Sequence, residues 1–146
     1  MTDDDVLELL RRGNEARAAA TADFGRAYDA AESEVARCWS AHMVAVMAED
    51  PHEKLRWNLE SLRAAEASLG DARAASLFPT VLGNVGFSNL LLARPEEAHA
   101  WYERALAALD VAELTGERRA AHEAGIRHML AIIADGEGGS GGASGD

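Results

Sequence analysis

The segment Leu82–Asp110 constrains the fold more than any other part of this sequence, because it predicts two helices joined by a tight turn. Its first half places Leu82, Val85, Gly86 and Asn89 on one helical face, at spacings of three and four residues. Pro95 then suits the first turn of a second helix, where its missing N–H is not needed. That second helix has the same kind of spacing, at Ala98, Tyr102, Ala105 and Leu106. Small residues beside an aromatic ring allow two helices to approach closely, so the segment predicts a tightly packed helical hairpin.

The spacing of the second helix recurs near the start of the chain, at Ala20, Phe24 and Ala27. This recurrence of the same spacing predicts a repeat architecture, in which each helix pair buries its apolar face against the next pair. We expect a first repeat over residues 1–32, with a short first helix that ends at Gly13-Asn14. A second repeat is expected over 33–70 and a third over 71–110.

The hairpin segment resembles a tetratricopeptide repeat, whose pattern combines a small residue in the first helix with an alanine–aromatic–alanine spacing in the second. The residues that carry the resemblance are Gly86, Ala98, Tyr102, Ala105 and Leu106, whereas Asn89 and Asp110 depart from the pattern. The resemblance implies an all-α fold, a right-handed α-α superhelix of about three helix-turn-helix repeats plus a C-terminal capping helix. It also implies a binding module, because such repeats supply surface rather than reaction chemistry.

Two further segments complete the expected domain, which spans residues 1–134. Ala72–Leu77 contains no turn residues, so we expect one long helix from about residue 71 to 92 with Pro79 inside it. A capping helix is expected over about 117–134. Its predicted buried side chains are Ala121, Ala124, Met129, Leu130 and Ile133. The last residues, 135–146, are rich in Gly and Ser and predict a flexible tail with nothing to bury.

The charge of the chain limits its partners. Its 146 residues carry a formal net charge of −11 at pH 7, which disfavours nucleic acid and anionic membrane surfaces. No apolar run approaches the length of a membrane span. The single cysteine, Cys38, cannot form an intrachain disulfide, so a cytoplasmic location is expected. The excess of Arg over Lys together with abundant Ala is typical of a GC-rich genome, and we expect a bacterial source.

The stretch from His42 to Asn58 is unusually rich in side chains that do specific chemistry. It holds His42, Lys54, Trp57 and Asn58, and Lys54 is the only lysine of the chain. One interpretation is structural, with Trp57 packed between repeats and His42 satisfied in the core. The other is a small polar site near the turn between helices, because Asn58 is a poor helix former placed where alanine would serve.

Asn84 is a further candidate, on the strength of the resemblance. It stands two residues before Gly86, where peptide-binding tetratricopeptide repeats often carry an Asn that faces the concave groove. The carboxylate clamp of that family also needs Lys or Arg on neighbouring first helices. Arg37 and Arg73 do not fall clearly at such positions, so a clamp is not expected. An interhelical role for Asn84 is the alternative.

Catalysis and metal binding find little support in the sequence. His122 and His128 are six residues apart and lie on different helical faces, and Cys38 has no cysteine partner for a metal. No glycine-rich phosphate loop or nucleophile motif occurs in the sequence. We therefore expect no enzymatic activity, no metal and no cofactor.

The function that these patterns favour is a binding module whose concave groove recognises a peptide or protein segment. One alternative is a small-molecule-binding, or unusual enzymatic, pocket centred on His42, Trp57 and Asn84. The other is a homodimerising scaffold, in which exposed Trp and Leu side chains of a terminal helix pair two chains.

Overall fold

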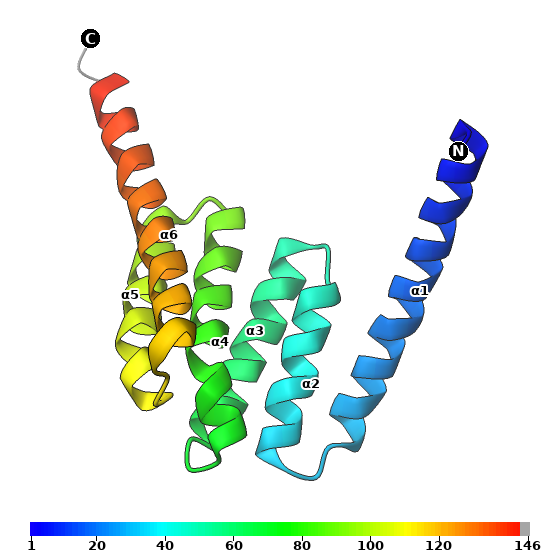
Figure 1. Cartoon of the computed structure of the whole chain (residues 1–146), viewed down its shortest axis with the longest axis horizontal. Coiled ribbons are helices and arrows are strands. Elements are labelled where there is room, and N and C mark those ends of the chain that lie inside the picture. The colour runs from blue at the N-terminus through cyan, green and yellow to red at the C-terminus, as the bar shows by residue number, and fades with distance from the viewer. Residues whose placement is uncertain (144–146) are drawn as a thin grey trace.

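The structure is a computed structural model that describes residues 1–143, with side chains as far as Gly136. These residues form six helices and no strand (Figure 1). The helices are α1 (Asp3–Ala30), α2 (Glu34–Met47), α3 (Pro51–Glu66), α4 (Ala72–Leu91), α5 (Pro95–Val111) and α6 (Gly116–Ala143). The prediction of an all-α domain is confirmed at this level. None of the described helices is both long and apolar enough to cross a membrane.

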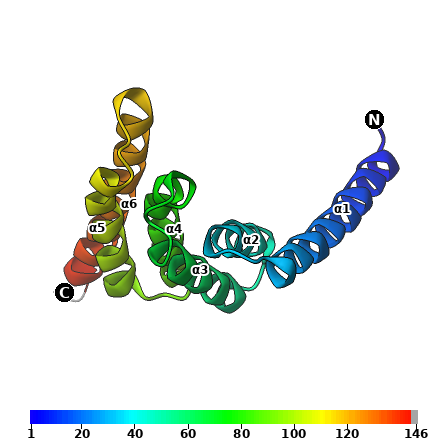
Figure 2. The same ribbon diagram turned by 90° about the horizontal axis from the view of Figure 1, so that it is seen from below.

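Consecutive helices pack against one another, and α2 also contacts α4. The pairs α2–α3 and α4–α5 are therefore two neighbouring hairpins, with α1 packed on α2 and α6 packed on α5. Figure 2 shows α2 and α4 side by side, with α3 beneath them. The core lies where the two hairpins meet. Its largest fully buried apolar side chains are Leu82, Leu109, Val81 and Val85.

The α4–α5 hairpin packs closely, as its sequence predicts. Ala98, Ala105 and Tyr102 are buried, and Gly86 lies directly against the Tyr102 ring. A Cβ atom at Gly86 would lie only 3.0 Å from two carbons of that ring and 3.3 Å from the Ala98 carbonyl oxygen. A Cβ atom at this position would require the Tyr102 ring or the Ala98 backbone to shift by a few tenths of an ångström.

Side-chain caps and prolines set where most helices begin. Thr2, Ser33, Asp50 and Asp71 each accept a hydrogen bond from a backbone N–H in the first turn that follows. Pro51 and Pro95 occupy the first turns of α3 and α5. By contrast, Pro79 lies inside α4, which confirms the prediction of one long helix through that residue.

The predicted first hairpin is wrong. Residues 3–30 form one uninterrupted helix, so the chain does not turn at Gly13-Asn14. A glycine inside a helix costs about 1 kcal/mol relative to alanine, which weakens the helix without ending it. Because α1 has no helix paired with it in this way, Ala27 is exposed and Ala20 is only half-buried. The alanine–aromatic–alanine spacing at Ala20, Phe24 and Ala27 therefore does not belong to a second close-packed hairpin.

The C-terminal helix begins near the predicted residue, but it buries fewer side chains than expected. Ile126 and Ile133 are buried, and Met129 and Leu130 are half-buried against the core. Ala121 and Ala124, which were expected to be buried, are exposed because α6 presses only one narrow stripe against its neighbours. The helix extends to Ala143, into the predicted tail, and residues 144–146 lie outside the described part of the chain.

Candidate binding groove

Two cavities flank Asn84 and Phe87 of α4. The first has a volume of about 200 Å³ and is also lined by side chains of α2, α3 and α4, namely Ala45, Val46, Lys54, Asn58 and Ser88. The second has a volume of about 370 Å³ and lies between α4, α5 and α6, with Tyr102, His122, Ile126 and Met129 in its wall. Because both cavities share Asn84 and Phe87, we treat them as one surface and call it the central groove.

Asn58 forms the buried polar end of the first cavity. The Ser88 hydroxyl donates its proton to the Asn84 carbonyl oxygen at 2.9 Å, so its oxygen can only accept from Asn58. The Asn58 Nδ2 therefore faces it, donating to Ser88 Oγ at 3.0 Å and to the Asn84 carbonyl at 3.4 Å. This orientation leaves Asn58 Oδ1 buried and without a hydrogen-bond partner among the described residues. Such an unsatisfied acceptor costs about 1–3 kcal/mol.

Lys54 lies one turn before Asn58 and closes the end of α2. Its Nζ donates to the carbonyl oxygens of Ala45 and Val46, at 3.1 and 3.4 Å. These carbonyls belong to the last turn of α2, where a positive charge interacts favourably with the helix dipole. The only lysine of the chain thus has a structural partner and also places a cation in the wall of the groove.

His42 positions the Asn84 amide from α2. Burial lowers the pKa of His42 below its usual value, so the imidazole is neutral at pH 7. The Asn84 Nδ2 lies 3.4 Å from His42 Nδ1, and a neutral ring protonated on Nε2 accepts this hydrogen bond. Asn84 Oδ1 has no hydrogen bond to the described residues, and Asn84 lines both cavities of the groove.

Exposed apolar side chains on α2 and α4 complete the surface. Phe87 is 45% exposed and Val46 is 43% exposed, and both line the groove. Trp39, 40% exposed, packs edge-on against His42 with ring centroids 6.1 Å apart. Sequence reasoning missed Phe87, which lines both cavities. The available signal for Phe87 was its position next to Gly86, which puts a large apolar side chain off the buried face of the helix.

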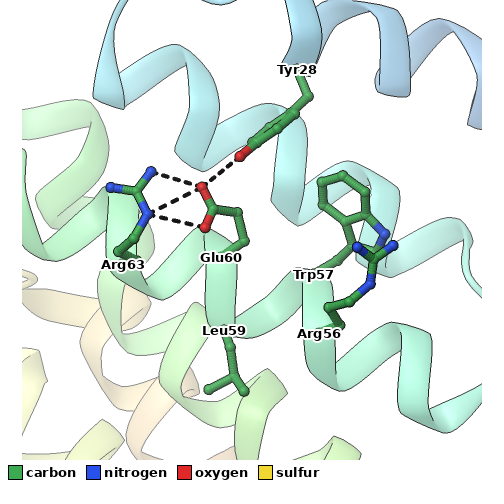
Figure 3. A pocket seen from close by; sticks show the side chains of 6 residues that line it. All are labelled: Tyr28, Arg56, Trp57, Leu59, Glu60 and Arg63. Carbon is green, nitrogen blue, oxygen red and sulfur yellow. Dashed lines mark hydrogen bonds and ion pairs between the residues drawn. The ribbon is translucent and has the colours of Figure 1, made fainter.

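Trp57 lies in a different place from the other predicted site residues. It lines a cavity of about 420 Å³ between α1 and α3 (Figure 3). Its ring packs edge-on against Tyr28 at 5.1 Å and lies beneath the Arg56 guanidinium at 4.9 Å. The structure therefore brings Lys54, Asn58 and Asn84 together in one cavity, and His42 is hydrogen-bonded to Asn84. Trp57 lines a different cavity.

The cavity beside Trp57 holds a polar network that joins α1 to α3. The Tyr28 hydroxyl donates to Glu60 Oε1 at 2.6 Å, and Arg63 donates to both oxygens of the same carboxylate, as Figure 3 shows. Arg63 also forms an ion pair with Glu34 at 3.1 Å. Hydrogen bonds from Arg63 lower the pKa of Glu60, and the hydrogen bond to Glu60 raises the pKa of Tyr28. Because each charge has a partner, we interpret this network as structural.

The described residues contain no group of three His, Cys, Asp or Glu side chains that could hold a metal ion. Cys38 is buried, and burial raises the pKa of its thiol, which keeps it protonated. Its Sγ lies 3.6 Å from Ser61 Oγ. These features favour a packing role for Cys38 rather than a nucleophilic one.

No protein-family model matches the chain, and comparison with curated proteins and with solved structures gave no significant match.

Proposed function

We propose that this protein is a tetratricopeptide-repeat-like binding module whose central groove recognises a peptide or protein segment. The observation that carries the proposal is the pair of cavities on either side of Asn84 and Phe87. Two stacked hairpins followed by α6 support the repeat-like architecture, because α2 and α4 then present their inner faces to one groove. The role is one of binding, in a cytoplasmic protein without a cofactor.

The groove offers an extended peptide both polar and apolar contacts. Asn84 presents an amide oxygen that a peptide N–H can bond, and Lys54 supplies a positive charge. Phe87 and Val46 present apolar surface to side chains of the ligand. Few polar groups in a mainly apolar surface are typical of binding sites, where they set orientation while apolar burial supplies affinity.

Selection from a random peptide library tests the proposal. Selected peptides should bind the wild-type protein in fluorescence polarisation, and Phe87→Ala or Asn84→Ala should weaken binding about tenfold or more, as expected for central contacts. Val111→Ala is the matched control, because Val111 is also exposed but lies at the end of α5. Peptides that bind all four proteins equally would show that the groove is not their site.

A small-molecule pocket is the second candidate, and the unsatisfied Asn58 Oδ1 favours it. A thermal-shift screen with metabolites and with the selected peptides separates the two, because a ligand that binds only the folded state raises the melting temperature. A metabolite that stabilises the wild-type protein but not Asn58→Leu would support the pocket. Stabilisation by peptides alone would support the groove.

A further inference from the structure

The second cavity of the central groove, between α4 and α6, is open because glycines stand in its wall on both of these helices. Gly83 of α4 and Gly125 of α6 line the cavity. A Cβ atom at Gly125 would meet no atom of a neighbouring helix within 4 Å, and one at Gly83 would meet only the Tyr102 ring, at 3.7 Å. The cavity volume of about 370 Å³ lies within the usual range of ligand pockets. There is therefore room in this cavity for a side chain that the protein itself does not supply.

The wall of this cavity contains no carboxylate, ammonium or guanidinium group. Asp, Glu, Lys and Arg make up 27% of the chain, yet none of them lines the cavity. Much of the wall is apolar, with Pro79, Phe87, Ile126 and Met129 in it. A charged side chain entering the cavity would lose water without meeting an oppositely charged Asp, Glu, Lys or Arg, which costs free energy. The wall therefore favours an uncharged occupant with an apolar body.

Tyr102 is the most buried of the polar side chains that line the cavity. Its side chain is 5% exposed, and its hydroxyl forms no hydrogen bond with the described residues. Burial raises the pKa of Tyr102 to about 12, so the hydroxyl keeps its proton at pH 7. A buried tyrosine hydroxyl usually has a hydrogen-bond partner. The cavity thus offers an O–H group that is free to donate to an occupant.

We propose that this cavity is a tyrosine pocket, which receives a tyrosine side chain of the peptide bound in the central groove. This inference rests on the function proposed above. The ring of the bound tyrosine covers the apolar wall, and its hydroxyl accepts a hydrogen bond from Tyr102. A phenylalanine would leave the Tyr102 hydroxyl without an acceptor, and a tryptophan N–H can only donate. A glutamate or lysine would bring a charge into the uncharged wall.

Peptides that the wild-type protein selects from a random library test the hydrogen bond. Tyrosine should be enriched at one position of these peptides. Its replacement by phenylalanine should weaken binding about two- to tenfold in fluorescence polarisation, which is the effect of one hydrogen bond. Tyr102→Phe should abolish this difference between the two peptides, because the hydroxyl that donates to the peptide is absent while the ring remains. Its urea midpoint should stay close to that of the wild type, since the lost hydroxyl has no partner among the described residues. Equal binding of both peptides to the wild type would overturn the proposal.

Gly125→Leu tests the location of the pocket. Gly125 lies between Ala121 and Met129 on the face of α6 that lines the cavity, so a leucine there would occupy the space of the bound tyrosine. We expect the tyrosine peptides to bind this variant at least about tenfold more weakly. Gly25→Leu is the matched control, because Gly25 also lies inside a long helix with no neighbouring atom within 4 Å of an added Cβ, but on α1. Equal affinities of the two variants would overturn the tyrosine pocket.

The outcomes of these experiments separate this inference from the proposed function. Peptides whose binding depends on Phe87 and Asn84, but which show no preference for tyrosine, would overturn the tyrosine pocket and leave the peptide-binding groove standing. Peptides that bind Gly125→Leu as tightly as the control would do the same. A library that yields no binder would overturn both proposals.

Discussion

Gly86 shows how one residue sets the distance between two helices. A Cβ atom there would press on the Tyr102 ring and the Ala98 carbonyl, whereas a Cβ at Gly83 would meet Tyr102 only at an ordinary 3.7 Å. We expect Gly83→Ala to raise the free energy of unfolding by up to about 1 kcal/mol through helix propensity. Gly86→Ala should fall below Gly83→Ala by about 1–3 kcal/mol, because it overpacks the hairpin. Urea unfolding measures both, and equal stabilities would contradict this account of the packing.

His42 gives the domain a defined pH dependence. Burial lowers its pKa below 6.5, so the unfolded chain takes up a proton at a pH where the folded protein does not. The stability is full above pH 6.5 and decreases as the pH falls through 6.5 towards the lower pKa of the folded state. His42→Gln keeps a side chain that can accept the Asn84 hydrogen bond but cannot titrate. The urea midpoint of the wild type should therefore fall more steeply below pH 6.5 than that of the variant, and parallel curves would contradict the assignment.

At the scale of helices, α1 and α5 carry the same alanine–aromatic–alanine spacing in different surroundings. Ala98 is fully buried between α4 and α5, and Ala27 is exposed on α1. Ala98→Leu should lower the free energy of unfolding by roughly 1–3 kcal/mol, because it forces two packed helices apart. Ala27→Leu should change it by no more than about 0.5 kcal/mol, as is usual for a surface substitution. Denaturation midpoints compare the two, and a large loss from Ala27→Leu would show that α1 has a close neighbour.

The sequence predicts those helices whose limits depend on local chemistry. Pro95 and the small residues around Tyr102 are close together in sequence, and they predict the start of α5 and its close packing on α4. Gly13 misled the prediction, because a single glycine only weakens a helix, and whether the helix continues depends on the sum over many neighbours. The position of α1 relative to the domain depends on contacts distant in sequence, such as Tyr28 with Glu60.

The candidate site could likewise be predicted from the sequence only where it depends on local helical spacing. Lys54 and Asn58 are one turn apart on α3 and face the same way, so their shared cavity follows from helical spacing. Trp57 and Asn58 are adjacent, which separates them by about 100° around the helix and sends one towards α1 and the other towards α4. Nothing in the local pattern shows which of the two faces the groove. That choice follows from the order in which the helices pack.

At the scale of the whole molecule, the domain and the glycine-rich segment are expected to contribute unequally to stability. Ile133 is the last side chain that the structure describes as buried. Deleting residues 136–146 should leave the melting temperature within error, because these residues are mostly Gly, Ser and Ala and have little apolar surface to bury. Calorimetry of the full chain and of the shortened chain makes the comparison. A clear drop in melting temperature would mean that the segment docks on the domain.

The buried Asn58 oxygen has a consequence for how this protein responds to mutation. The unsatisfied Asn58 oxygen lowers the stability of the free protein. Substitutions that remove such a group are often stabilising, but at binding sites they usually reduce function. Asn58→Leu should therefore fold about as stably as the wild type, because removal of the unsatisfied Oδ1 offsets the loss of the hydrogen bonds that Nδ2 donates to Ser88 and Asn84. Variants selected for heat resistance alone would be free to lose Asn58. Variants selected for binding would keep Asn58. A comparison of residue 58 between the variants from the two selections would therefore test whether Asn58 belongs to the binding site.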